Sequence, residues 1–264
     1  MKIDPSTAEI TVVGDIGFDN IFSLAFDSDS NKLYGFSETI ASDFSSSSSQ
    51  LVEIDLTSGA GVAVGSPRVP PLWPEAIGGL TYDSGSGELL AANADLTNTI
   101  VDLLGISPET GVASNLGDIE DPSFNFSVAF VSALAYEPAS DLLYGYESLA
   151  GLRFFSLDPQ TLFADQIGGV EFDRNIDGMA FDADGQTMYA VEEELFLTED
   201  SFTLVTVDLL TGVRTPIGSL DIDSSSRLFG LAYVGVVPES SSLVIAGVLA
   251  AYAAGCRLPG RAHR

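Results

Sequence analysis

Short apolar runs alternate with polar turn sequences along most of the chain, a pattern typical of β-strands rather than of helices. One four-residue theme, with an apolar second position and an aromatic fourth position, recurs five times. Its copies are SLAF (23–26), GLTY (79–82), ALAY (133–136), GMAF (178–181) and GLAY (230–233). Successive copies lie 56, 54, 45 and 52 residues apart, which indicates a repeated structural unit.

Three further apolar runs follow each of the first four copies, and Asp, Ser, Gly and Pro separate them. The second run comes after a turn, in the sequences DSDSNKLYGF (27–36), DSGSGELLAA (83–92), EPASDLLYGY (137–146) and DADGQTMYAV (182–191). The third lies in VEIDLTSGAG (52–61), LGISPETGVA (104–113), FSLDPQTLFA (155–164) and TVDLLTGVRT (206–215), and the fourth ends at a glycine. Four antiparallel strands in about 45–55 residues are the period of a β-propeller blade. The sequence therefore predicts an all-β propeller of about five blades, with a stacked β-sandwich as the alternative.

The two ends of this body predict a ring closed by a split blade. Four units fall near 21–75, 76–130, 131–175 and 176–228, and a fifth combines 229–236 with 1–20. Residues 1–20 match third and fourth strands, and residues 229–236 match a first strand, so the second strand is missing. Three explanations stay open: a segment upstream of Met1, a three-stranded blade, or a strand that continues from Val234 to Val237.

The charge is strongly acidic, with 38 Asp and Glu against 10 Lys and Arg and a formal net charge of −28. Such a surface repels phosphates, so nucleic acid is excluded as a partner. The one histidine, His263, lies near the end of the chain, which excludes histidine-based acid–base catalysis in the body. The single Cys256 cannot form an internal disulfide.

The last 28 residues, 237–264, differ from the rest: a Pro-Glu motif, an uncharged apolar run and three arginines follow one another. The 14 residues from Leu243 to Cys256 predict an apolar helix outside the ring. At about 1.5 Å per residue it would span roughly 21 Å, short of a hydrocarbon core of about 30 Å but adequate for a transient stop-transfer segment. Arginines beyond it favour a cytoplasmic C-terminus. A helix packed on the body is the alternative.

This tail resembles the PEP-CTERM sorting signal of Gram-negative and related bacteria, although Ser240 stands where a second proline is usual. The matching residues are Val237, Pro238 and Glu239 in the sorting motif, Leu243, Val244, Ile245, Val248, Leu249 and Tyr252 in the membrane segment, and Arg257, Arg261 and Arg264 in the basic cluster. The resemblance implies export, brief anchoring in the inner membrane, cleavage near Pro238-Glu239 by an exosortase-type protease, and release to the cell surface or an exopolysaccharide matrix. Proteins of this kind also carry a signal peptide. The start MKIDPSTAEI has no apolar region of that kind, so we expect a gene model that is truncated at its N-terminus.

Acidic pairs are the remaining candidate chemistry. Asp27 with Asp29, and Asp182 with Asp184, have the D-x-D spacing of calcium loops, but both pairs fall where a tight turn also favours Asp. The run Glu192–Glu194 is expected to be a solvated face. The sequence thus predicts a binding or structural propeller scaffold whose partners are a sorting protease and exopolysaccharide or a surface protein. A metal-dependent, lactonase-like hydrolase that uses channel carboxylates is the alternative, and Ca²⁺ is the candidate cofactor.

Overall fold

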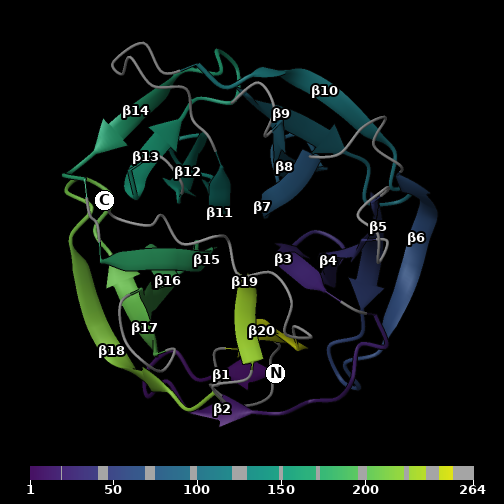
Figure 1. Ribbon diagram of the computed structural model, residues 1–264, viewed down its shortest axis with the longest axis horizontal. Coiled ribbons are helices and arrows are strands. Elements are labelled where there is room, and N and C mark those ends of the chain that lie inside the picture. The colour runs from purple at the N-terminus through teal and green to yellow at the C-terminus, as the bar shows by residue number, and fades with distance from the viewer. Residues whose placement is uncertain are drawn as a thin grey trace, which may run out of the picture.

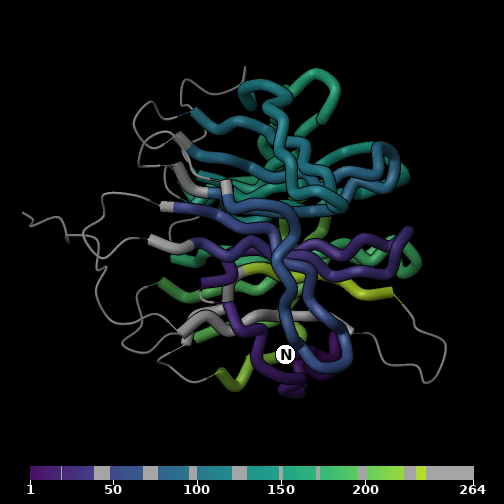
Figure 2. Tube along the Cα trace, turned by 90° about the vertical axis from the view of Figure 1, so that its right-hand side faces the viewer, coloured from purple at the N-terminus to yellow at the C-terminus, as the bar shows by residue number. Residues whose placement is uncertain are grey.

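A computed structural model describes residues 1–18, 20–40, 47–68, 75–95, 100–120, 130–148, 151–170, 173–195, 201–222, 226–235 and 244–251. These residues form five four-stranded antiparallel sheets, set like blades round a central axis (Figure 1). Figure 2 shows the ring from the side, with the strands running between its two faces. The propeller prediction is confirmed, and the sandwich alternative is excluded because the sheets form a ring and not two stacked layers.

Four blades are continuous in sequence, and each places its first strand nearest the axis. The first blade has β3 (Ile21–Asp27), β4 (Lys32–Ile40), β5 (Ser47–Ile54) and β6 (Gly61–Arg68). The second has β7 (Glu75–Asp83), β8 (Glu88–Asp95), β9 (Ile100–Ile106) and β10 (Ala113–Asp118). The third has β11 (Val131–Glu137), β12 (Leu142–Glu147), β13 (Arg153–Leu157) and β14 (Ala164–Ile167). The fourth has β15 (Arg174–Asp182), β16 (Thr187–Glu194), β17 (Phe202–Val207) and β18 (Arg214–Leu220).

The fifth blade joins the two ends of the described chain. Its strands, from the axis outward, are β19 (Ser226–Val234), β20 (Val244–Ala251), β1 (Lys2–Ile3) and β2 (Ile10–Thr11). This one sheet contains strands from both stretches that the sequence combines, 229–236 and 1–20. The second strand comes from the tail: β20 pairs with β19 from Val234↔Val244 to Ser226↔Ala251, and with β1 at Ile3↔Ile245 and Lys2↔Ala246.

The predicted apolar helix outside the ring is therefore wrong for Val244–Ala251, which is a strand inside the blade. An uncharged run of this length carries no periodicity that separates a buried strand from a helix. In the structure, hydrogen-bonding partners on both sides, β19 and β1, decide for the strand. Among the residues that the structure describes, no helix has the length and apolar character needed to cross a membrane.

The hydrophobic core consists of layers between neighbouring blades rather than one central mass. In one layer, Leu90 and Val101 of the second blade pack with Leu134, Leu143 and Leu157 of the third. Each inner strand contacts the inner strand of the next blade all the way round, from β3 through β7, β11, β15 and β19 back to β3. Closure in this way leaves no inner edge strand exposed.

Glycines near the end of the outer strands dock each blade on the turn of the next one. A Cβ atom at Gly65 would lie only 2.0 Å from the carbonyl oxygen of Thr110, and the backbone there has φ +69°. The same close approach recurs at Gly14 against Ser58 and at Gly168 against Thr211. At these three positions packing between blades therefore requires the glycine.

Candidate functional site

The recurring four-residue theme forms the last part of each inner strand, and its positions have distinct roles. The second position is buried in the layers between blades, with 1–2% of the residue exposed at Leu24, Leu80, Leu134, Met179 and Leu231. The third position is small, as in Ala25 and Ala232, because neighbouring inner strands converge toward the axis. The fourth position is aromatic in every copy and lies at the end of the strand, where the central channel opens.

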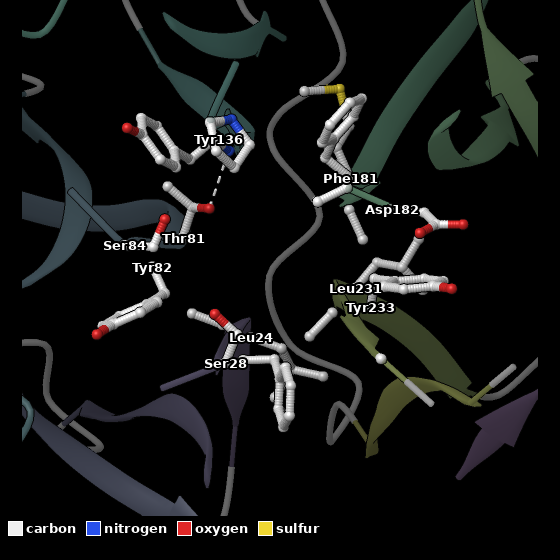
Figure 3. Close-up of a pocket in the computed structure, with 18 of the residues that line it drawn as sticks. Leu24, Ser28, Thr81, Tyr82, Ser84, Tyr136, Phe181, Asp182, Leu231 and Tyr233 are labelled. Carbon is white, nitrogen blue, oxygen red and sulfur yellow. Dashed lines mark hydrogen bonds between the residues drawn. The ribbon is translucent and has the colours of Figure 1, made fainter. Parts of the chain in front are cut away.

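A cavity of about 220 Å³ lies at this channel mouth, and all five inner strands contribute to its wall. Its aromatic lining comes from the fourth position of the theme: Phe26, Tyr82, Tyr136, Phe181 and Tyr233. Figure 3 shows Tyr82, Tyr136, Phe181 and Tyr233 arranged round the opening, with Leu24 and Leu231 nearer its centre. We take this cavity as the candidate binding site, because it is concave, largely apolar and built by the rigid inner ring.

Hydrogen bonds hold the aromatic residues in place. The Tyr82 hydroxyl donates to Asp29 Oδ2 at 2.9 Å, and the Tyr136 hydroxyl donates to Asp141 Oδ1 at 2.8 Å. The backbone N–H of Tyr136 donates to Thr81 Oγ1 at 3.0 Å, which links two inner strands (Figure 3). Desolvation, strengthened by these carboxylates, raises the pKa of the Tyr82 and Tyr136 hydroxyls, so both stay protonated at neutral pH.

Tyr233 is held differently, through its ring. It stacks on Tyr189 of the neighbouring blade with centroids 6.2 Å apart and an interplanar angle of 2°. Desolvation and the nearby Asp182 carboxylate raise the pKa of its hydroxyl. Three of the five aromatic side chains are thus held by contacts within the protein.

An acidic residue follows the theme in four of its copies, and each one caps the turn into the second strand. Asp27 Oδ1 accepts the backbone N–H groups of Asp29 at 2.9 Å and Ser30 at 3.0 Å. Asp182 Oδ1 accepts those of Asp184 at 3.0 Å and Gly185 at 2.9 Å. Asp83 and Glu137 make the corresponding bonds to their own turns.

The D-x-D pairs therefore act in turn formation, which was one of their two interpretations. The two acids of each pair make different contacts: Asp29 accepts from the Tyr82 hydroxyl, and Asp184 is exposed where it lines the cavity. Across the described ranges, no group of three or more His, Cys, Asp or Glu side chains is placed to hold a metal ion.

A second cluster of charges lies in the fourth blade and contacts the third through Tyr146, and it was not expected from the sequence. Glu192 and Glu193 are 2% and 5% exposed, so the prediction of a solvated face is wrong for them. Glu192 Oε1 accepts from Arg174 at 2.5 Å, and its Oε2 accepts from Arg214 at 2.8 Å. Arg214 also lies over the ring of Tyr146, 5.7 Å from its centroid.

Burial lowers the pKa of the Arg214 guanidinium, whereas the hydrogen bond and charge of Glu192 raise that of Arg174. A smaller cavity of about 150 Å³ between the two blades is lined by Arg214, Tyr146 and Phe154, among others. Both arginines bind one carboxylate, so the ion pairs join β15, β16 and β18 within the fourth blade. The contact of Arg214 with Tyr146 reaches the third blade. The sequence gives only one signal for this cluster, which is that arginine is rare in so acidic a chain.

Of the predicted tail residues, Val244, Ile245, Val248 and Leu249 lie in β20. The sorting motif and the basic cluster lie outside the described residues, as do two residues of the predicted membrane segment. These are Val237, Pro238, Glu239, Leu243, Tyr252, Arg257, Arg261 and Arg264.

Comparison with known proteins identifies the fold. No protein-family model and no curated protein sequence matches the chain. A solved structure of a Bacteroides thetaiotaomicron protein of unknown function is similar at 13% identity and a TM-score of 0.54, covering 88% of this chain and 60% of that one. A nidogen/laminin complex (12% identity, TM-score 0.48, 81% and 84% covered) and a putative 6-phosphogluconolactonase from Bacteroides uniformis (13%, 0.46, 86% and 82%) are also similar. At such identities the similarity shows the fold alone, and the chain is a β-propeller with a candidate binding site at its channel mouth.

Proposed function

We propose that this protein is an exported β-propeller that acts as a binding and structural scaffold at the cell surface or in the extracellular matrix. The observation that carries the proposal is the cavity at the channel mouth, to which every blade contributes. A closed ring holds its inner strands rigidly, which suits binding by preformed geometry. At the cell surface or in the matrix, its partner is exopolysaccharide or a surface protein.

The proposal includes sorting through the C-terminal segment. The order of Pro238-Glu239, an uncharged apolar run and three arginines supports cleavage by an exosortase-type protease. The pairing of β20 between β19 and β1 adds a requirement. The segment has to leave the fifth blade before it can enter a membrane, so membrane anchoring and closure of that blade exclude each other.

The alternative, a metal-dependent hydrolase of the lactonase-like kind, is supported less well. It requires carboxylates that converge in the channel and are available to a metal or to substrate. The capping acids at this mouth, such as Asp27 and Asp182, already accept the N–H groups of their own turns. The apolar residues Leu24, Leu80 and Leu231 also line the cavity.

The test is the mature C-terminus of the protein. The full chain, fused behind a secretion signal, is produced in a bacterium that has an exosortase and in the same strain without it. We expect mass spectrometry to find secreted protein that ends near Pro238-Glu239 in the first strain, and full-length protein in the membrane fraction of the second. Glu239→Ala is expected to reduce cleavage, with Glu199→Ala as the control. An intact C-terminus in both strains would refute the sorting proposal.

A further inference from the structure

The chemistry of the channel-mouth cavity narrows the class of its ligand. Its wall carries five aromatic side chains and, among the described lining residues, two acids and no Lys, Arg or His. Asp182 is buried at the edge of the cavity, and Asp184 is exposed on its rim. Aromatic faces and carboxylates both attract cations, and neither attracts an anion.

The polar groups of the wall are largely occupied by the protein itself. The Tyr82 and Tyr136 hydroxyls donate to Asp29 and Asp141, and Thr81 Oγ1 accepts from a backbone N–H. Asp182 Oδ1 accepts two backbone N–H groups of its turn. A primary ammonium binds best where several free acceptors converge on it, and these acceptors already take part in bonds within the protein.

A methylated ammonium group has no such need. It bears a full positive charge spread over apolar methyl groups, and aromatic side chains bind it without hydrogen bonds. The cavity of about 220 Å³ is far larger than the space that one water needs. It can therefore take a trimethylammonium head with a short alcohol arm.

The charge of the whole molecule favours the same ligand. The formal net charge is −28. A concave apolar site in a strongly negative protein raises the local concentration of cations. The carboxylates near the rim also raise the pKa of Tyr82 and Tyr233, after the larger effect of desolvation. This is the response expected in a negative local potential.

We propose that the cavity at the channel mouth binds small organic cations that carry a trialkylammonium or tetraalkylammonium group. The inference rests on the proposed binding role and specifies its ligand class, and it does not depend on how the protein is sorted.

The test compares three probes that share a two-carbon alcohol arm, by calorimetric titration and ligand-observed NMR of the full chain. Choline has the charge and the methyl groups, 3,3-dimethyl-1-butanol has the same shape without the charge, and ethanolamine has the charge without the methyl groups. We expect choline to bind at least tenfold more tightly than either of the others, and its affinity to fall as NaCl is raised. Equal binding of choline and ethanolamine would show an ion atmosphere only, and equal binding of the neutral alcohol would show an apolar cavity only. Either result overturns the proposal. The absence of choline binding at a concentration of about 50 mM also overturns it.

Variants locate the site. Tyr82→Leu and Tyr233→Leu remove one aromatic ring each and are expected to weaken choline binding about fivefold or more. Tyr82→Phe keeps the ring and loses the bond to Asp29, so it is expected to bind almost as well as the unchanged protein. Phe163→Leu removes an aromatic ring that is 46% exposed and does not line the cavity, and it serves as the control. Thermal melts show that each variant is folded. If Phe163→Leu weakens binding as much as Tyr82→Leu, the site lies elsewhere and the proposal fails. That failure is distinct from a failure of sorting, which the mature C-terminus reports.

Discussion

The carboxylate of Glu192 is expected to stabilise the fold far more than an exposed carboxylate in a similar ion pair. Its side chain is 3% exposed and accepts from Arg214, whose side chain is 9% exposed, and from Arg174, whose side chain is 42% exposed. In Glu192→Gln, Arg174 can turn toward water and Glu194, 3.3 Å away. Arg214 stays buried over Tyr146 and loses the carboxylate that faces it.

The magnitude follows from this burial. Removing one partner of a buried ion pair costs about 3–5 kcal/mol, because the remaining charge stays out of water. The matched control is Glu53→Gln, which breaks the Lys32–Glu53 pair at 2.9 Å with side chains 44% and 38% exposed. Exposed pairs of this kind contribute about 0–1 kcal/mol. The expected difference between the two variants is therefore several kcal/mol, although both remove one negative charge.

Urea unfolding followed by tyrosine fluorescence measures the free energy of unfolding of each variant. A third variant, Glu192→Gln with Arg214→Met, is expected to recover part of the loss, since it also removes the buried cation. Raising NaCl to about 0.5 M is expected to remove the small stabilisation from the exposed Lys32–Glu53 pair. The stabilisation from the buried pair is expected to stay nearly unchanged. The reasoning is refuted if Glu192→Gln costs no more than Glu53→Gln.

Two further predictions concern a half-buried acid and a glycine. Burial raises the pKa of Glu38 from 4.5 to about 7. As the pH rises, the unfolded chain therefore loses this proton at a lower pH than the folded protein does. Its contribution to stability is complete below about pH 4.5 and is lost as the pH rises to about 7, by up to roughly 3 kcal/mol. Glu38→Gln is expected to remove that slope in urea unfolding between pH 4.5 and 8, and an unchanged slope contradicts the assignment. Gly65→Ala is expected to lower stability well beyond Gly17→Ala in calorimetric melts. Both glycines have positive φ, at a cost of about 1–2 kcal/mol, but only at Gly65 would the new Cβ meet a carbonyl oxygen, at 2.0 Å. Equal costs would contradict the role of Gly65 in blade docking.

Much of the site was visible in the sequence as a repeat. The theme at 23–26 and its four later copies predict the first strand of each unit, and a turn is one of the two interpretations of Asp27 and Asp182. These features depend on the alternation of apolar and polar residues and on hydrogen bonds between residues at most three positions apart, such as the bond that the Ser30 N–H donates to Asp27. Local sequence determines such features directly.

The sequence by itself determined an all-β fold, the four-stranded unit, the split fifth blade and the acidic character of the surface. Tertiary structure alone decided that Val244–Ala251 is a strand, because an uncharged run suits a helix or a buried strand and its partners β19 and β1 lie at opposite ends of the chain. It also decided that Glu192 is buried, since Arg214 comes from another strand of the blade and Tyr146 from the blade before it. The aromatic cavity exists for the same reason. Aromatic residues are common in strands, so no single one of them indicates a binding site. Only closure of the ring brings five of them to one opening.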